Sequence, residues 1–241
     1  MYSVPEVLDN IDHNAWVWIF TAFGWACGFT QLVTGIWLTW RNRIIALPLG
    51  YIVIIFAHDS SVALNADYWF NGVGHWYFIM SWAGSPLCVI AEAICIVWFS
   101  RLWYREFQPA IPERLFSASM ALFVFGAIVL YRLYEQFIDD PLHVSGLFIA
   151  QIVNITFMIP LILRRGSAHG TNRVLAWALV GVSTLGMCIP LSIVAEYRTF
   201  WGYATVASMA SLSLFYVYLV HYFQRRDALA EVTRQASVPV A

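Results

Sequence analysis

Asp59 is an ionisable residue in a stretch of sequence that is otherwise apolar, between Phe56 and the run Val-Ala-Leu at 62–64. A carboxyl group in the hydrocarbon layer of a membrane costs about 2.5–3.5 kcal/mol on insertion scales, so a functional reason for it is expected. Burial favours the protonated form of a carboxyl, and a protonated carboxyl can act as a general acid. The alternative interpretation is a helix-end carboxylate that reaches the lipid headgroups.

Three further acids are candidates for proton transfer: Glu92, Glu135 and Glu196. Arg132 precedes Glu135 by three residues, which places both side chains on one face of a helix. Each acid also has a structural interpretation. The Arg132–Glu135 pair could fix helix packing, Glu196 could pair with Arg198, and Glu92 could bond a neighbouring helix.

Polar and aromatic residues near these acids are candidates for binding a substrate. They are His58, Asn65, Trp69, His75, Trp76 and Tyr77, together with Tyr197 beside Glu196. An aromatic face stabilises a cation by about 0.5–2 kcal/mol. An aromatic pocket with one protonated carboxyl could therefore start and guide carbocation chemistry. The same composition could also bind a sterol or a quinone without reaction.

Metal-site patterns are not found in the sequence. The spacing of His58 and His75 matches no known zinc signature. Asp139 and Asp140 precede Pro141, and we expect this run to form a turn in which the proline opens the next helix. It does not match a diphosphate–magnesium motif, so we expect no metal and no other cofactor.

The elements that position these residues are predicted from composition. The 241 residues are 61% hydrophobic and 11% charged, whereas soluble domains carry about 25% charged residues. An integral membrane protein is therefore predicted. No basic patch suited to nucleic acid is present. All 13 basic residues are arginine, and the absence of lysine excludes a retinal Schiff base.

We predict an all-α fold, with one transmembrane domain over residues 1–241 that forms a bundle of seven helices. Spans of about 20 apolar residues are expected at 16–39, 44–65, 76–100, 116–137, 142–163, 174–196 and 200–223. All arginines except Arg132 and Arg198 follow spans 1, 3, 5 or 7. The positive-inside rule then places the N-terminus outside and the C-terminus in the cytoplasm.

This orientation predicts the depth of each acid. Asp59, Glu135 and Glu196 end spans 2, 4 and 6 and should lie near the outer surface, where they are expected to cluster with Arg132. Glu92 lies in the inner half of span 3 and is a secondary candidate. The clustering requires that these helix faces turn away from lipid.

Three segments around Asp59 carry a resemblance to a known family: Ala-His-Asp-Ser-Ser at 57–61, Asp-Tyr-Trp-Phe-Asn at 67–71 and Gly-His-Trp-Tyr at 74–77. The chain resembles the small integral-membrane terpene cyclases of bacterial indole-sesquiterpenoid and fungal meroterpenoid pathways, which are similar in size and have seven spans. The fungal branch carries a Trp-Glu pair in span 2, which is missing here, so Asp59 would take its place. Glu196 is the nearest match to the second fungal acid.

The resemblance implies an enzyme, a terpene cyclase of the isomerase or lyase type that protonates an alkene or epoxide of a farnesyl- or geranylgeranyl-bearing substrate. Asp59 would be the acid, and Glu196 or the Glu135–Arg132 pair would accept the final proton or reload the acid. The implied partners are this lipophilic substrate, membrane lipid, and an upstream prenyltransferase or epoxidase. The implied location is a bacterial cell membrane.

Two other classes of function stay open. A proton-coupled transporter, or a lipid- or sterol-binding protein, would use the acids to carry protons or to bind a ligand. Pro86, Pro160 and Pro190 lie inside predicted spans and favour broken helices of the kind that transporters use. A heptahelical structural or receptor subunit is the third alternative, and the predicted clustering of acids disfavours it.

Overall fold

The computed structural model describes residues 2–236, and the side chains of residues 2–233. Every regular element in this range is helical, which confirms the predicted all-α fold. The α-helices are α1 (Val4–His13), α2 (Ala15–Asn42), α3 (Leu49–Ala63), α4 (Trp76–Phe107), α5 (Glu113–Ile138), α6 (Val144–Arg165), α7 (Arg173–Gly181), α8 (Met187–Ile193) and α9 (Phe200–Ala236). Two π-helices, η1 (Tyr68–Val73) and η2 (Val182–Gly186), and the 3-10 helix η3 (Ala195–Tyr197) complete the set.

In the described part of the chain, six helical segments are long and apolar enough to cross a membrane. They are α2, α4, α5, α6, α9 and the segment from α7 to α8 (Arg173–Ile193). The second predicted span, 44–65, is different, because its helix has only 15 residues. A helix of this length is about 22 Å long, which is less than the roughly 30 Å of a hydrocarbon core.

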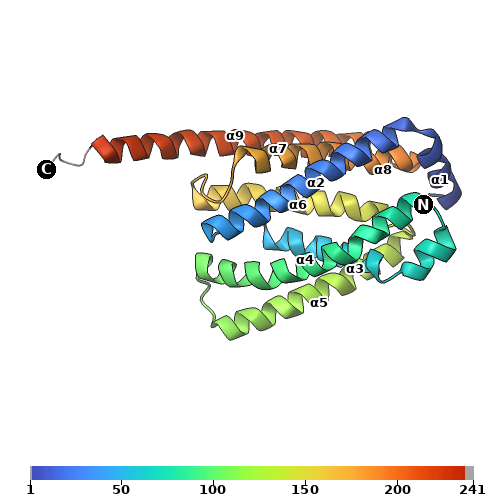
Figure 1. The fold of residues 1–241 in the computed structure, drawn as a ribbon, viewed down its shortest axis with the longest axis horizontal. Helices are drawn as coiled ribbons and strands as arrows, with labels where there is room; N and C mark the ends of the chain where they lie inside the picture. Colours follow the sequence, from blue (N-terminus) through green and yellow to red (C-terminus); the bar gives the residue numbers. More distant parts are fainter. Residues whose placement is uncertain (1, 237–241) are drawn as a thin grey trace.

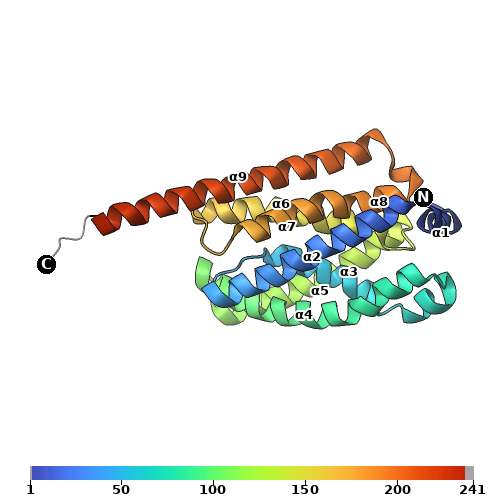
Figure 2. The same ribbon diagram turned by 45° about the horizontal axis from the view of Figure 1, so that its top comes forward.

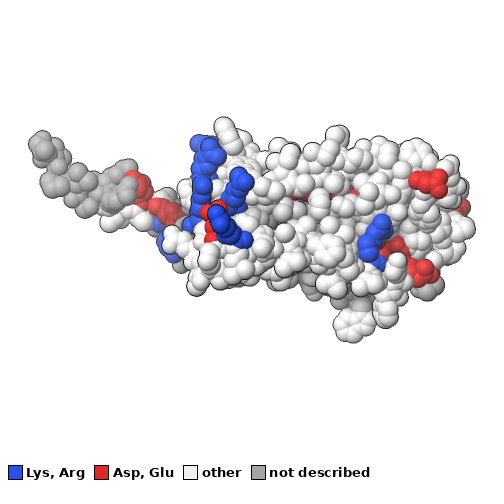
Figure 3. All heavy atoms as spheres, turned by 90° about the horizontal axis from the view of Figure 1, so that it is seen from below, with Lys and Arg blue, Asp and Glu red and all other residues white. Residues whose placement is uncertain are grey.

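The long helices run side by side along the long axis of the molecule (Figures 1 and 2). The C-terminal part of α9 projects beyond one end of the bundle, while α1 and η1 lie at the other end (Figure 1). Most basic residues visible in Figure 3 gather toward the end from which α9 projects. A nearly uncharged band separates them from acidic residues and a smaller basic patch at the opposite end. Arg234, one of the arginines used to predict the orientation, has a side chain outside the described residues.

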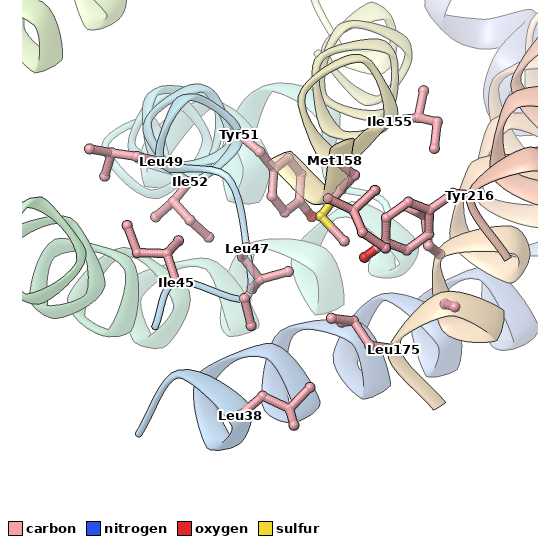
Figure 4. Close-up of a cluster of buried hydrophobic side chains, with 14 of the residues drawn as sticks. Leu38, Ile45, Leu47, Leu49, Tyr51, Ile52, Ile155, Met158, Leu175 and Tyr216 are labelled. Carbon is pink, nitrogen blue, oxygen red and sulfur yellow. The ribbon is translucent and has the colours of Figure 1, made fainter. Parts of the chain in front are cut away.

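The short α3 begins late because the residues before it are held in an irregular, bent segment. Leu47 in this segment is fully buried and packs directly on Gly35 of α2, where any larger side chain would clash with it. Arg165 of α6 forms an ion pair with Glu106 of α4, with Nε 2.6 Å from Oε1. The Arg165 guanidinium also donates to the carbonyl of Ile45, and the Ile45 N–H donates to Glu106. Figure 4 shows the surrounding hydrophobic core.

The sixth predicted span is interrupted. Between α7 and α8 the chain takes the π-helical turn η2, a form that is rare and often lies at functional sites. α2 approaches this turn closely, since a Cβ atom on Gly24 would lie 3.0 Å from the backbone of Gly186. The helix ends at Ile193, three residues after Pro190, so the predicted end of the span at 196 falls in the separate helix η3.

The prediction that Pro141 opens the next helix is wrong, since α6 begins at Val144. Asp140 caps this helix, accepting hydrogen bonds from the backbone N–H groups of Val144 (3.1 Å) and Ser145 (2.7 Å). The Tyr2 hydroxyl also donates to Asp140. Burial and the nearby Asp140 carboxylate raise the pKa of Tyr2, so this hydroxyl keeps its proton and ties the N-terminal segment to the start of α6.

Candidate functional site

A cavity of about 270 Å³ lies between α2, α3, α4, α6 and the interrupted segment from α7 to α8. Its volume is near the lower end of the range of small-molecule sites, about 300–1,000 Å³. Aromatic residues form much of its wall: Trp25, Phe29, Tyr51, Trp69, Tyr77 and Phe78. Its polar lining includes His58, Asp59, Glu92, His143 and Gln151. The cavity is therefore mainly apolar, with a few ionisable groups.

Two carboxyl groups meet at the cavity wall. Asp59 of α3 lies beside Glu92 and Cys88 of α4, and the three side chains line the cavity together. The side chain of Asp59 is 16% exposed, and Glu92 as a whole is 1% exposed. One Glu92 oxygen has no hydrogen-bond partner among the described residues. A carboxylate only accepts hydrogen bonds, so two neighbouring carboxyls can bond to each other only when one of them carries a proton.

A line of polar side chains leads away from this carboxyl pair. His58 Nε2 lies 3.8 Å from Asp59 Oδ1, which is beyond hydrogen-bond distance. On its other side, His58 Nδ1 lies 2.8 Å from the hydroxyl of Tyr131 on α5. Glu135 follows Tyr131 by one turn of α5 and lies near its hydroxyl. His58 and Tyr131 thus lie between Asp59 and a second buried acid, with gaps between Asp59 and His58 and between Tyr131 and Glu135.

Glu135 is buried and is held from two sides. Its Oε1 contacts Nδ1 of His143, and its Oε2 lies 3.5 Å from the guanidinium of Arg132. The predicted placement of Arg132 and Glu135 on one helix face is therefore confirmed. His143 lines the cavity and Glu135 lies behind it, so the acid contacts the cavity only through the histidine ring. Because Nδ1 of His143 contacts Glu135, Nε2 is the ring nitrogen of His143 that is left to take up a proton.

Gly146 allows these groups to come together. It lies in the first turn of α6, against the Tyr131 hydroxyl and Nδ1 of His58. A Cβ atom at position 146 would clash with both of them. The hydrogen bond between His58 and Tyr131 thus depends on the absence of a side chain at this position.

Two of the predicted aromatic residues are rigid parts of the cavity wall. Trp69 is almost fully buried, donates from Nε1 to the carbonyl of Val62 (2.9 Å) and stacks on Phe78 at a centroid distance of 5.6 Å. The hydroxyl of Tyr77 lies 2.9 Å from Thr21 Oγ1. Because each polar tip has a partner inside the protein, the ring faces are held in fixed orientations.

Three other predicted residues lie outside the cavity lining. His75 caps α4 with Nδ1 and contacts Asp12 through Nε2 at 3.2 Å. Trp76 stacks on Trp18 with a centroid distance of 4.7 Å. Asn65 lies in the turn that follows α3. These residues shape the end of the bundle and do not line the cavity.

The structure does not bring Glu196 into the acidic cluster. It is exposed in η3, beyond the end of α8. Tyr197, the next residue, packs against Phe148, and it does not line the cavity either. Arg198 donates to the carbonyls of Leu191 (2.8 Å) and Ser192 (2.7 Å). The alternative ion pair of Glu196 and Arg198 is not formed among the described side chains.

The sequence reasoning did not single out His143, Tyr131, Cys88 or Gln151. His143 follows a turn-forming Asp-Asp-Pro-Leu run and takes a left-handed backbone conformation with φ 56°. No sequence pattern indicated that its ring would contact Glu135. Tyr131 directly precedes Arg132 on a predicted span. This position next to charged residues is the one feature of the sequence that indicates a role for it in the site.

No group of three or more His, Cys, Asp and Glu side chains in residues 2–233 is arranged to hold a metal ion. No family model matches the chain, and comparison with curated proteins and with solved structures gives no match either. The function of the site is therefore inferred from its geometry.

Proposed function

We propose that this protein is a membrane-bound terpene cyclase that starts cyclisation by protonating a farnesyl- or geranylgeranyl-bearing substrate, without a metal. The supporting observation is the pair of neighbouring carboxyls, Asp59 and Glu92, in the wall of an aromatic cavity. An apolar, buried acid is the group that can transfer a proton to an alkene or an epoxide. A prenyl chain enters hydrocarbon with a gain of about 0.8 kcal/mol per CH₂, so a site within a membrane suits it.

In the proposed reaction, Asp59 gives its proton to a terminal alkene or epoxide of the substrate. With an alkene, its π electron pair forms the new C–H bond. With an epoxide, the oxygen takes the proton and keeps the electron pair of the broken C–O bond. In both cases a carbocation remains on the chain. The hydrogen bond from Glu92 stabilises the new Asp59 carboxylate. The faces of Trp25, Trp69 and Phe78 stabilise the successive cations.

The final carbocation must lose a proton for the cycle to close. We assign this step to His143, which lines the cavity and is oriented by Glu135. The proton can return to Asp59 through Glu135, Tyr131 and His58. The 3.8 Å gap between His58 and Asp59 requires one bridging water or a small side-chain rotation. Substrate and product then have the same mass, and Glu196 is not needed as the second acid.

We further propose that the chain crosses a cell membrane seven times, with the N-terminus outside. α3 and residues 64–73 together lead the chain from the end of α2 to the start of α4 at the opposite end of the bundle (Figure 1). The gathering of basic residues toward the C-terminal end supports a cytoplasmic C-terminus. The carboxyl pair would then lie in the outer half of the membrane.

The decisive experiment is product analysis by mass spectrometry. Membranes containing the protein are supplied with prenylated aromatics and their epoxides, in parallel with the Asp59→Asn variant. We expect a product of unchanged mass and shifted retention from the wild type only, since the amide has no acidic proton. Asp67→Asn is the matched control, because Asp67 is exposed and bonded to Asn71 outside the cavity. A well-folded Asp59→Asn protein with full turnover would exclude Asp59 as the acid.

A second candidate function is proton-coupled transport. The π-helical turn η2 contributes Val182 and Gly186 to the cavity wall, and transporters place such interruptions at their binding sites. Reconstituted vesicles with an imposed pH gradient would accumulate a lipophilic ligand if this were the function. Uptake without any cyclised product would favour transport over catalysis.

A further inference from the structure

Three residues of the cavity lining also lie on the outer surface of the bundle. Phe29 of α2 is 55% exposed and Met80 of α4 is 42% exposed, and Gly84 of α4 is exposed as well. α2 and α4 both line the cavity, but they do not pack extensively on each other. The cavity therefore reaches the surface sideways, between these two helices.

Exposed apolar side chains surround this opening. The exposed neighbours of Phe29 and Met80 are apolar, among them Val33 on α2 and Leu87 and Ile90 on α4. In a protein with several helices long enough to span a membrane, such a surface faces lipid tails. A molecule that enters here passes from hydrocarbon into the cavity without crossing water.

The opening leads directly to the carboxyl pair. Gly84, Cys88 and Glu92 follow one another at intervals of four residues, so they share one face of α4. All three line the cavity, and Cys88 and Glu92 are both partners of Asp59. A chain that enters at Gly84 moves along this face toward the acids.

We propose that the opening bounded by Phe29, Met80 and Gly84 is a lateral entrance through which an isoprenoid chain enters from the bilayer, apolar tail first. A tail-first path brings the terminal alkene or epoxide to Asp59 and leaves a polar headgroup at the membrane side of the opening. The identity of the chain as a cyclisation substrate rests on the proposed function, whereas the entrance itself rests on the cavity and its exposed rim.

The test is to close the opening with the variant Gly84→Phe. A Cβ atom at position 84 meets no other atom within 4 Å, so the ring can be added without disturbing the packing. Gly126→Phe on α5 is the matched control, because its Cβ is equally unobstructed and it does not line the cavity. The probe is a farnesyl chain that carries a photoreactive diazirine, dissolved in the lipid of reconstituted vesicles. Labelled residues are located by mass spectrometry.

We expect labelling of cavity residues such as Trp25 and Trp69 in the wild type and in Gly126→Phe. In Gly84→Phe the rate of this labelling should fall about tenfold or more, since access would then require a conformational change. Equal labelling of the Gly84→Phe cavity would overturn the entrance, as would a wild-type cavity that the probe never labels. If no cyclised product is found while Gly84→Phe still blocks labelling, the cyclase proposal fails and the entrance stands.

Discussion

Tyr131 is the residue on which the connection between the two acidic sites depends. Its hydroxyl is bonded to His58, next to Asp59, and lies near Glu135, which holds His143. A phenol can donate one hydrogen bond and accept another, so it can pass a proton between these groups without moving its ring. His58 and Glu135 come from different helices and form no hydrogen bond with each other among the described residues, so Tyr131 is the hydroxyl placed between them.

Tyr131→Phe removes this hydroxyl and keeps the ring. If the proton returns to Asp59 by this route, turnover should fall by about a hundredfold, the lower end of a general acid–base contribution. The pH dependence of turnover should also change, because the acid must then be reloaded from water. Both are measured by steady-state product formation across pH, with Tyr134→Phe on the same helix as control.

Labelling by the diazirine probe distinguishes this role from a purely structural one. It should be unchanged in Tyr131→Phe, since the cavity keeps its shape. A Tyr131→Phe protein with the turnover and pH profile of the wild type would show that reprotonation takes another path.

Among the elements, the bent segment before α3 determines where the acid-bearing helix lies. Leu47 is buried against α2, and the backbone of Ile45 is held by Arg165 and Glu106. These contacts set the first turn of α3 in the bundle, and the position of Asp59 near its end follows from helix geometry. A charge pair at one end of the molecule thereby supports a cavity in its other half.

Glu106→Gln leaves Arg165 without its partly buried carboxylate partner. Breaking a fully buried ion pair from one side typically costs about 3–5 kcal/mol, so for this partly buried pair we expect the free energy of unfolding to fall by about 2 kcal/mol. Unfolding by denaturant in detergent micelles measures this loss. Glu113→Gln, at an exposed position in the first turn of α5, is the control and should cost less than about 1 kcal/mol. Equal losses in the two variants would contradict a stabilising role for the pair.

For the whole molecule, the central question is how often the chain crosses the membrane. Six long apolar segments are found in the described residues, and α3 is too short to be counted with them. A short helix can still complete a crossing when it is shielded from lipid by its neighbours. α3 meets this condition, since it packs against α4, α5 and α6 and much of it is buried.

The number of crossings predicts where the two termini lie. With seven crossings they are on opposite sides, whereas with six they are on the same side. Short epitope tags at each terminus, probed by an antibody in intact and permeabilised cells, should therefore show the N-terminus accessible from outside and the C-terminus only after permeabilisation. A tag in the loop at 166–172 is the control and should behave like the C-terminus. Two termini on one side would mean that α3 does not complete a crossing.

Much of the fold and part of the site could be predicted from the sequence alone. Composition and the spacing of apolar residues determined the all-α class and the six long helices, because each residue's preference for lipid or water is a local property. The same reasoning singled out Asp59, because a carboxyl in an apolar stretch has a cost of insertion into the membrane that does not depend on its tertiary neighbours. It also placed Arg132 beside Glu135, because helix periodicity relates residues three apart.

Only the tertiary structure decided which of these residues meet. The turn after α3 and the π-helix η1 extend the chain past the end of α3, and α4 then runs back along it. Glu92 is thereby placed beside Asp59, although the sequence predicted that it lies deeper in the membrane. The end of α8 at Ile193 leaves Glu196 exposed, although its position suggested a second acid. The cap by Asp140 shifts the start of α6 and brings His143 to Glu135. Such contacts depend on where helices begin, break and cross, and local sequence preferences do not contain that information.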